Sequence, residues 1–142
     1  VYKLDVVALQ ECETSDAYPE LLGKFVFSGA AEAKANRGHV HLYVRYGLKF
    51  DRCLVAGDRP CVVARLDCSS VGGAQNKDLL VVAVHLPTGD QAQERRRTVE
   101  QALAAGGATR GNVLVLGDFN AQDISPRGRL RRRNSVYMVH PC

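Results

Sequence analysis

The apolar run at residues 79–86 constrains the fold of this chain more than any other stretch. Leu79 to Val84 are apolar without interruption, and Pro87 ends the run. A run of this length, rich in Val and Leu and without polar alternation, predicts a strand that is buried on both faces. The sheet that contains it must therefore be covered on both sides.

The segments around this run also read as strands. Further short apolar runs predict strands at residues 4–10, 25–27, 61–66 and 112–116. Residues 39–46 alternate, with Val40 and Leu42 on one face and His39 and His41 on the other, and predict a half-buried strand. The small and polar residues 28–38 are interpreted as a loop.

One helix is expected between the two most apolar strands. The sequence from Asp90 to about Ala105 predicts a helix that two glycines end. Val99, Ala102 and Leu103 fall on one stripe of it. Strands, a helix and another strand in this order predict an α/β domain with a mixed sheet.

The composition fits one soluble globular domain. The chain has 142 residues, 46% of them hydrophobic and 24% charged, and no apolar stretch is long enough to predict a membrane span. Its five cysteines form no CxxC pair, which favours reduced thiols over a structural zinc site. Unpaired cysteines, and no visible secretory signal, favour an intracellular location, cytoplasmic or nuclear. The sequence identifies no protein partner.

The net charge of +4 comes from the C-terminal residues. Residues 1–123 hold 14 Lys and Arg against 15 Asp and Glu, whereas five arginines fall in residues 124–142. We therefore divide the chain into a body, residues 1–123, and a basic tail, residues 124–142. Arg131 and Arg132 of the tail are candidates for contact with phosphate or nucleic acid, and the alternative is that they are simply solvated.

Polar groups follow or end three of the predicted strands. Glu11 follows the first, His85 lies at the end of the long apolar run, and Asp118 and Asn120 follow the last. Ligands of open α/β sheets bind beyond the carboxyl ends of the strands, so these groups converge if the strands are neighbours. A carboxylate that holds Mg²⁺, a second one that activates water, and an amide and an imidazole that bind phosphoryl oxygens suit hydrolysis at phosphorus.

Each of these residues also has a purely structural interpretation. Glu11 can be a solvated carboxylate at the end of a strand, and His85 a hydrogen-bonded, half-buried histidine. Asp118 and Asn120 after a glycine are a common way to build a turn. His39 and His41 are interpreted as a solvent-facing or loop-covered pair rather than as metal ligands, because no third donor lies near them.

Three motifs, in this order and at this spacing, resemble the endonuclease/exonuclease/phosphatase superfamily of DNase I-like proteins. They are Leu9-Gln10-Glu11, Val84-His85-Leu86 and Leu116-Gly117-Asp118-Phe119-Asn120-Ala121. The resemblance covers roughly residues 3–123. It implies a sandwich of two mixed β-sheets flanked by helices, and a hydrolase of phosphodiester or phosphomonoester bonds that uses Mg²⁺ or Mn²⁺.

The resemblance also implies a role for each matching residue. Glu11 is similar to the glutamate that binds the metal, and Asp118 to the aspartate that orients or activates the attacking water. Asn120 is similar to the asparagine that holds this water and the phosphate. His85 is similar to the histidine that contacts phosphate or supplies a proton. Gln10 supports the glutamate.

A looser match and two missing motifs complete the prediction. Leu42-Tyr43-Val44-Arg45 resembles a family strand that ends in tyrosine and arginine, so Arg45 is a further candidate for phosphate contact. An asparagine before the Gln-Glu motif and an Asp-His pair near the C-terminus are absent. We therefore expect residues 1–123 to be a partial domain, incomplete in this chain.

Two classes of function stay open. The first is a nuclease that acts on RNA or DNA, with a slight preference for the deadenylase-type branch because Arg95 and Gln101 lie on the helix after His85. The second is a catalytically inactive module on the same fold that binds nucleic acid or another partner. A phosphatase of inositol phosphates is a further alternative within the family.

Overall fold

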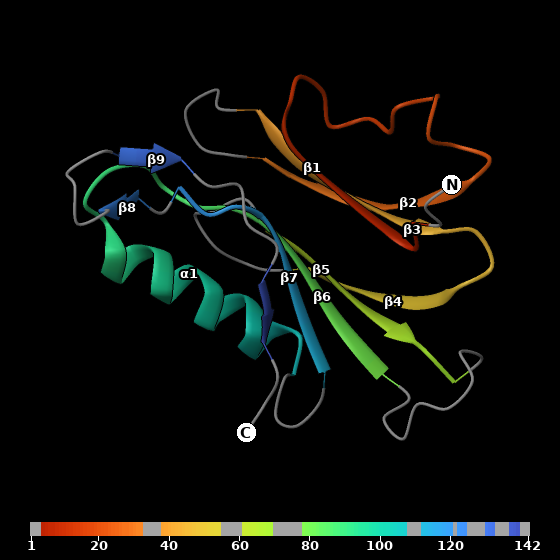
Figure 1. Ribbon diagram of the computed structural model, residues 1–142. Coiled ribbons are helices and arrows are strands. Elements are labelled where there is room, and N and C mark those ends of the chain that lie inside the picture. Colours follow the sequence, from red (N-terminus) through yellow and green to blue (C-terminus); the bar gives the residue numbers. More distant parts are fainter. Residues whose placement is uncertain are drawn as a thin grey trace.

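The computed structural model consists of two β-sheets packed face to face, with a helix outside one of them (Figure 1). The structure describes residues 4–32, 38–54, 61–69, 78–107, 112–120, 122–124, 130–132 and 137–139, without the side chains of residues 28, 30–32, 52–54 and those beyond 120. The first sheet, sheet A, has the order β1-β3-β2, and its strands are antiparallel. These strands are β1 (Val6–Cys12), β2 (Phe25–Glu32) and β3 (His39–Arg45).

The second sheet, sheet B, is mixed and has the order β10-β7-β6-β5-β4. Its strands are β4 (Lys49–Leu54), β5 (Cys61–Asp67), β6 (Asp78–His85), β7 (Asn112–Asp118) and β10 (Tyr137–Val139). Only β6 and β7 pair in parallel, and helix α1 (Ala92–Ala105) connects them. Strands β8 (Gln122–Ile124) and β9 (Leu130–Arg132) form a separate ribbon after β7.

The run at residues 79–86 is buried on both faces, as predicted. Val81 and Ala83 of β6 belong to the core cluster between the two sheets. Leu80, Val82 and Val84 belong to a second cluster, which Ala102 of helix α1 completes. β6 therefore has an apolar layer on each side, which is what its lack of polar alternation requires.

Two predictions about sheet A were wrong, and one strand of sheet B was missed. Residues 28–32 are not a loop, because β2 continues through a bulge after Phe27 and pairs with β3 as far as Glu32. β3 is not half-buried, because it is the central strand of sheet A and both His41 and Tyr43 are fully buried. β4 was not predicted, since its alternating polar residues gave no apolar run.

The helix and the C-terminal strands refine the other predictions. Helix α1 begins at Ala92, close to the predicted Asp90, and buries Ala102 as expected. β10 pairs with β7 at the edge of sheet B, so part of the predicted tail joins the body through its backbone. The boundary after residue 123 stays a prediction.

Two general properties follow from the described residues. No helix among them combines the length and apolar character needed to cross a bilayer. Cys12, Cys61 and Cys68, the cysteines whose side chains are described, are free thiols. Burial raises the pKa of Cys61 to about 11, so this thiol stays protonated at neutral pH.

Candidate active site

The carboxyl ends of β6 and β7 bring His85 and Asp118 together. The strands are parallel, and their register pairs His85 with Asp118. The backbone N–H of Leu86 donates to the carbonyl oxygen of Asp118 at 2.8 Å. Gly117 allows this approach, because a Cβ at this position would overlap the carbonyl oxygen of Val84. The glycine of the third motif is therefore needed to seat Asp118 beside His85.

Asn120 ties the turn after β7 to the end of β6. Its backbone N–H donates to Oδ1 of Asp118 at 2.9 Å, and its side-chain Nδ2 donates to the carbonyl oxygen of Leu86 at 2.7 Å. The first bond forms the predicted turn, and the second links Asn120 to the residue after His85. Asn120 thus forms the predicted turn with Asp118 and, through the same arrangement, lies at the end of β6 where the candidate site is expected.

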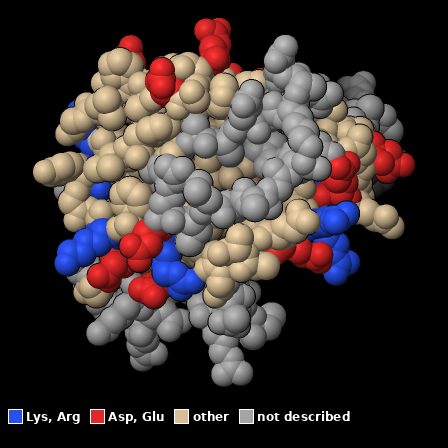
Figure 2. Space-filling model, turned by 180° about the vertical axis from the view of Figure 1, so that it is seen from behind, with Lys and Arg blue, Asp and Glu red and all other residues tan. Residues whose placement is uncertain are grey.

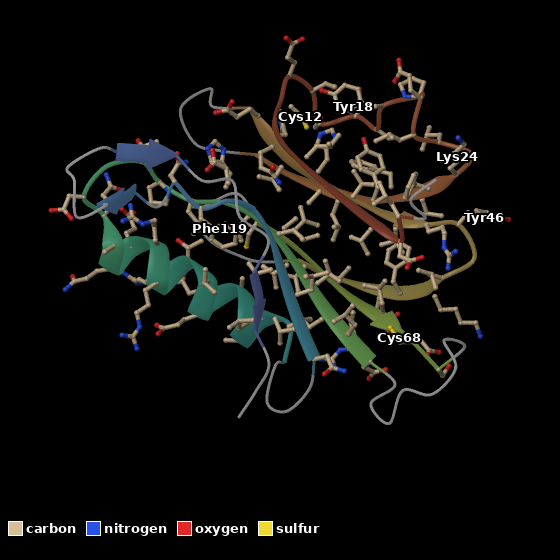
Figure 3. The ribbon with its side chains drawn as sticks, viewed as in Figure 1. Cys12, Tyr18, Lys24, Tyr46, Cys68 and Phe119 are labelled. Atoms are coloured by element: carbon tan, nitrogen blue, oxygen red, sulfur yellow. The ribbon has the colours of Figure 1, made fainter. Side chains whose placement is uncertain are left out.

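Glu11 reaches this group from the other sheet. Its Oε1 lies 3.9 Å from Nε2 of His85, and the side chains of Glu11 and His85 are 73% and 11% exposed. Figure 3 shows Cys12, which follows Glu11, and Phe119, which follows Asp118, toward the same end of the two sheets, whereas Tyr46 and Cys68 lie toward the opposite end. The site is therefore built from both layers of the sandwich.

Two of the four predicted site residues have a strained backbone. Glu11 has φ 57° and Asn120 has φ 44°, and these are the only non-glycine residues with positive φ in the described part of the chain. Such a conformation costs on the order of 1–3 kcal/mol for each residue and is concentrated at functional sites. Both of the described non-glycine residues with positive φ are thus candidates that were chosen from the sequence.

Oxygen donors of the kind that Mg²⁺ takes from proteins lie at this end of the sandwich. No group of three or more His, Cys, Asp or Glu side chains suited to a metal occurs among the described residues. Mg²⁺ commonly keeps several waters and takes only one or two carboxylates from the protein. The exposed carboxylate of Glu11 can supply such an oxygen ligand, and Asp118 offers a second carboxylate near the same histidine.

The remaining candidates lie in different places. Gln10 precedes Glu11, and its buried Nε2 has no hydrogen-bond partner among the described residues. Arg45 lies at the opposite end of β1, where its Nε is 2.9 Å from Oδ1 of Asp5, so it does not join the other candidates. Arg131 and Arg132 belong to β9, and their side chains lie outside the described part.

Sequence reasoning missed a buried polar network beside Glu11. Nε2 of His41 lies 2.6 Å from the carbonyl oxygen of Thr14, and its Nδ1 lies 3.1 Å from the hydroxyl of Tyr43. The N–H of Tyr18 donates to that hydroxyl at 2.9 Å. Burial lowers the pKa of His41 and favours the neutral ring. The alternation of His41 with Tyr43 on one strand face was the available signal.

This network fixes which ring nitrogen of His41 carries the proton. A carbonyl oxygen can only accept a hydrogen bond, so Nε2 is the donor to Thr14. In the neutral ring Nδ1 then accepts from the hydroxyl of Tyr43. Every polar atom of the ring is satisfied, and the residues after β1 are held over the outer face of β3.

The charge on the side away from the view of Figure 1 is mixed. Figure 2 shows basic and acidic side chains next to one another at the lower left and at the right of this side, and acidic ones at its top. No broad basic field covers the described part of this face. Attraction of a polyanion to this side therefore has no strong electrostatic source among those residues.

Comparison with known proteins gives a consistent result. The family model described as "Endonuclease/Exonuclease/phosphatase family" matches residues 1–138. The catalytic domain of human Nocturnin with a bound sulfate anion superposes with a TM-score of 0.55 and 17% identity, over 82% of this chain and 51% of that chain. No curated protein matches the sequence.

A second solved protein has the same fold. D. rerio TDP2 in complex with a single-strand DNA product gives a TM-score of 0.52 and 20% identity, over 84% of this chain and 49% of that chain. A humanized form of D. rerio TDP2 with 14 mutations gives 0.53 and 19%, over 84% and 50%. The predicted DNase I-like fold is confirmed, and this chain spans about half the length of these structures.

Proposed function

Because the chain belongs to the endonuclease/exonuclease/phosphatase family, we propose that it carries part of the active site of a Mg²⁺-dependent enzyme that hydrolyses phosphodiester bonds of nucleic acids. One observation carries the proposal. Glu11 of sheet A lies 3.9 Å from His85 of sheet B, and His85 is paired in register with Asp118. A carboxylate, an imidazole and a second carboxylate thus meet at one end of the sandwich.

Glu11 would hold the metal ion. Its carboxylate is exposed, and a single protein carboxylate with several waters is a common arrangement for Mg²⁺. The bound ion would neutralise phosphate charge and stabilise the leaving oxygen. Mn²⁺ accepts the same oxygen ligands and would substitute for it.

The other three residues would act on water and on the phosphate. The carboxylate of Asp118 accepts one hydrogen bond from Asn120 through Oδ1, and a carboxylate has further lone pairs that can orient and deprotonate a water. His85 would donate a hydrogen bond to a phosphoryl oxygen. The amide of Asn120, held by the carbonyl of Leu86, would contact the same water or the phosphate.

The substrate class is proposed from chemistry and from the two neighbours. The structure of D. rerio TDP2 holds a single-strand DNA product, and that of human Nocturnin holds sulfate, a tetrahedral oxyanion like phosphate. Arg95 supports the loop after His85, because its Nη1 donates to the carbonyl oxygens of Pro87 and Gly89. We propose single-stranded nucleic acid as the substrate. Within this class we slightly prefer poly(A) RNA, on which a deadenylase acts, to DNA.

The test is cleavage of end-labelled oligonucleotides by the intact enzyme that carries these residues, in the presence and absence of Mg²⁺. We expect metal-dependent product, faster with poly(A) RNA than with single-stranded DNA. Glu11→Gln and Asp118→Asn should each lose at least about 100-fold in rate. Glu100→Gln, an exposed carboxylate of helix α1 paired with Arg96, is the matched control and should keep the wild-type rate.

Two results would contradict the proposal. Salt-sensitive binding of oligonucleotides without turnover would favour the inactive binding module. Faster release of phosphate from inositol phosphates than cleavage of oligonucleotides would favour the phosphatase alternative. Mg²⁺ binding, followed by calorimetry on the wild-type chain and on Glu11→Gln, tests the metal ligand separately from turnover.

A further inference from the structure

The end of β1 is irregular at the residues of the Gln-Glu motif. In its pairing with β3, Leu9 lies opposite His41 and Cys12 lies opposite His39. Gln10 and Glu11 therefore stand opposite a single residue of β3, which is the pattern of a β-bulge. An extra residue of this kind bends the strand and redirects its side chains, and it often lies beside an active site.

Gly38 allows this bulge to pack against the start of β3. A Cβ at Gly38 would lie 2.8 Å from the carbonyl carbon of Glu11 and 2.9 Å from the carbonyl oxygen of Cys12. Both contacts are with backbone atoms, which cannot rotate away as a flexible side chain does. Gly38 also has φ +77°, a conformation that other residues rarely adopt. Position 38 therefore requires glycine for two independent reasons, the close backbone contact and the positive φ.

His41 holds the chain immediately after the bulge. Its Nε2 contacts the carbonyl oxygen of Thr14 at 2.6 Å, and the hydroxyl of Tyr43 links its other nitrogen to the N–H of Tyr18. His41 and Tyr43 are fully buried. Because buried hydrogen bonds are costly to break, residues 14 and 18 are fixed relative to β3.

We propose that Gly38 and His41 are positioning residues for Glu11, which hold the bulge in the conformation that brings its carboxylate to His85. The inference rests on the proposed function for the role of Glu11, but the geometric part can be measured without activity. Gly38 fixes the bulge from the side of β3. His41 fixes the segment that leaves it.

The conformation of Glu11 supports a positioning role over an ordinary turn. A bulge that served only to end the strand would be most stable with glycine or asparagine at positive φ, whereas this chain has a glutamate there with φ 57°. Gly23 and Gly47 also have positive φ, but a Cβ at either would meet nothing within 4 Å. Gly38 differs from them by its close contact with the backbone of Glu11.

The test compares Gly38→Ala with Gly47→Ala in the whole chain. Both changes introduce a side chain at positive φ, and only Gly38→Ala also pushes on Glu11. The first readout is the nuclear Overhauser effect between the Glu11 side chain and the His85 ring. The second is Mg²⁺ affinity measured by calorimetry. Gly38→Ala should lose the first and weaken the second by about 10- to 100-fold. Gly47→Ala should keep both.

A second pair of variants covers the case in which Gly38→Ala does not fold. His41→Phe keeps an aromatic ring against Phe27 but removes both hydrogen bonds, and His41→Gln restores a donor that can reach Thr14. We expect the nuclear Overhauser effect between Glu11 and His85 to weaken in His41→Phe and to return in His41→Gln. A general loss of stability would not be reversed in this selective way.

The outcomes separate this inference from the proposed function. If the wild-type chain shows the nuclear Overhauser effect between Glu11 and His85, and folded Gly38→Ala loses it, or folded His41→Phe loses it where Gly38→Ala does not fold, positioning is supported even when the chain binds no Mg²⁺. In that case only the proposed function fails. If folded Gly38→Ala keeps both the nuclear Overhauser effect and the wild-type affinity for Mg²⁺, positioning is overturned. Where Gly38→Ala does not fold, the same result for folded His41→Phe overturns it. A wild-type chain without the effect would overturn it as well.

Discussion

The two faces of β3 are both fully buried, yet they are held in different ways. Val40, Leu42 and Val44 face sheet B and belong to the apolar cluster between the sheets. His41 and Tyr43 lie on the other face, under the segment after β1, and are joined to it by hydrogen bonds. Apolar packing is non-directional, whereas hydrogen bonds fix particular atoms relative to one another. The inner face of β3, toward sheet B, therefore contributes stability. The outer face, under the segment after β1, fixes the position of that segment.

The largest effect is expected on the inner face. Leu42→Ala would leave a cavity at a fully buried position of the core cluster, and we expect it to lower the free energy of unfolding by about 2–5 kcal/mol. Leu22→Ala is the control, because Leu22 is 50% exposed and should lose far less. Urea unfolding followed by circular dichroism measures both. Equal losses in the two variants would mean that the inner face is not the main source of stability.

A smaller effect is expected on the outer face. Tyr43→Phe keeps the ring but removes the hydroxyl that joins His41 to the N–H of Tyr18. An unsatisfied buried donor and acceptor should lower the free energy of unfolding by about 1–3 kcal/mol. Tyr46→Phe, at a position that is 75% exposed, provides the matched control and should change it little. If the two variants are equally stable in urea, the hydroxyl does not hold the segment.

The smallest effect is a dependence of stability on pH. Burial lowers the pKa of His41 in the folded chain below its ordinary value of 6.5. Below pH 6.5 the unfolded chain therefore binds a proton that the folded chain excludes, so stability falls as pH falls, until the pH reaches the folded pKa. One excluded proton contributes at most about 1.4 kcal/mol per pH unit. Above pH 6.5 this contribution to stability is fully present.

Comparison with His41→Gln isolates this contribution. Urea unfolding of both chains at several pH values between 7.5 and 5 should give a wild-type curve that falls more steeply on the acid side, since the other titrating groups are common to both. Parallel curves would show that His41 is not held neutral. The inner face of β3 has no titrating group, so Leu42→Ala should leave the shape of the pH curve unchanged.

The sequence predicted those parts of the fold that depend on local pattern. The apolar run at residues 79–86 became β6, buried on both sides, and the stripe with Ala102 became the buried face of helix α1. β4 was missed because its residues alternate without an apolar run, and pairing with β5 fixes it instead. Pairing with β3 likewise extends β2 through residues that read as a loop. Tertiary pairing overrides local preference in both strands.

The candidate site was predictable to the same extent. His85 and Asp118 end neighbouring parallel strands, and that rule places them together as soon as the two strands are recognised. Gly38 and His41 could not be assigned to the site in this way. Gly38 lies 27 residues from Glu11, and His41 lies 27 residues from Thr14, so only the fold shows these contacts.

The separation of Glu11 from His85 along the chain has a consequence for the order of folding. β6, helix α1 and β7 follow one another in the sequence and can pair with little loop closure, whereas the contact between Glu11 and His85 needs the two sheets to dock. During synthesis, at about 5–20 residues per second, Glu11 is made roughly 5–20 s before Asp118. The residues of the bulge and of β3, with which it pairs, are thus synthesised before the strands of sheet B that hold His85 and Asp118. We expect the contact between Glu11 and His85 to mark the last step of folding rather than the first.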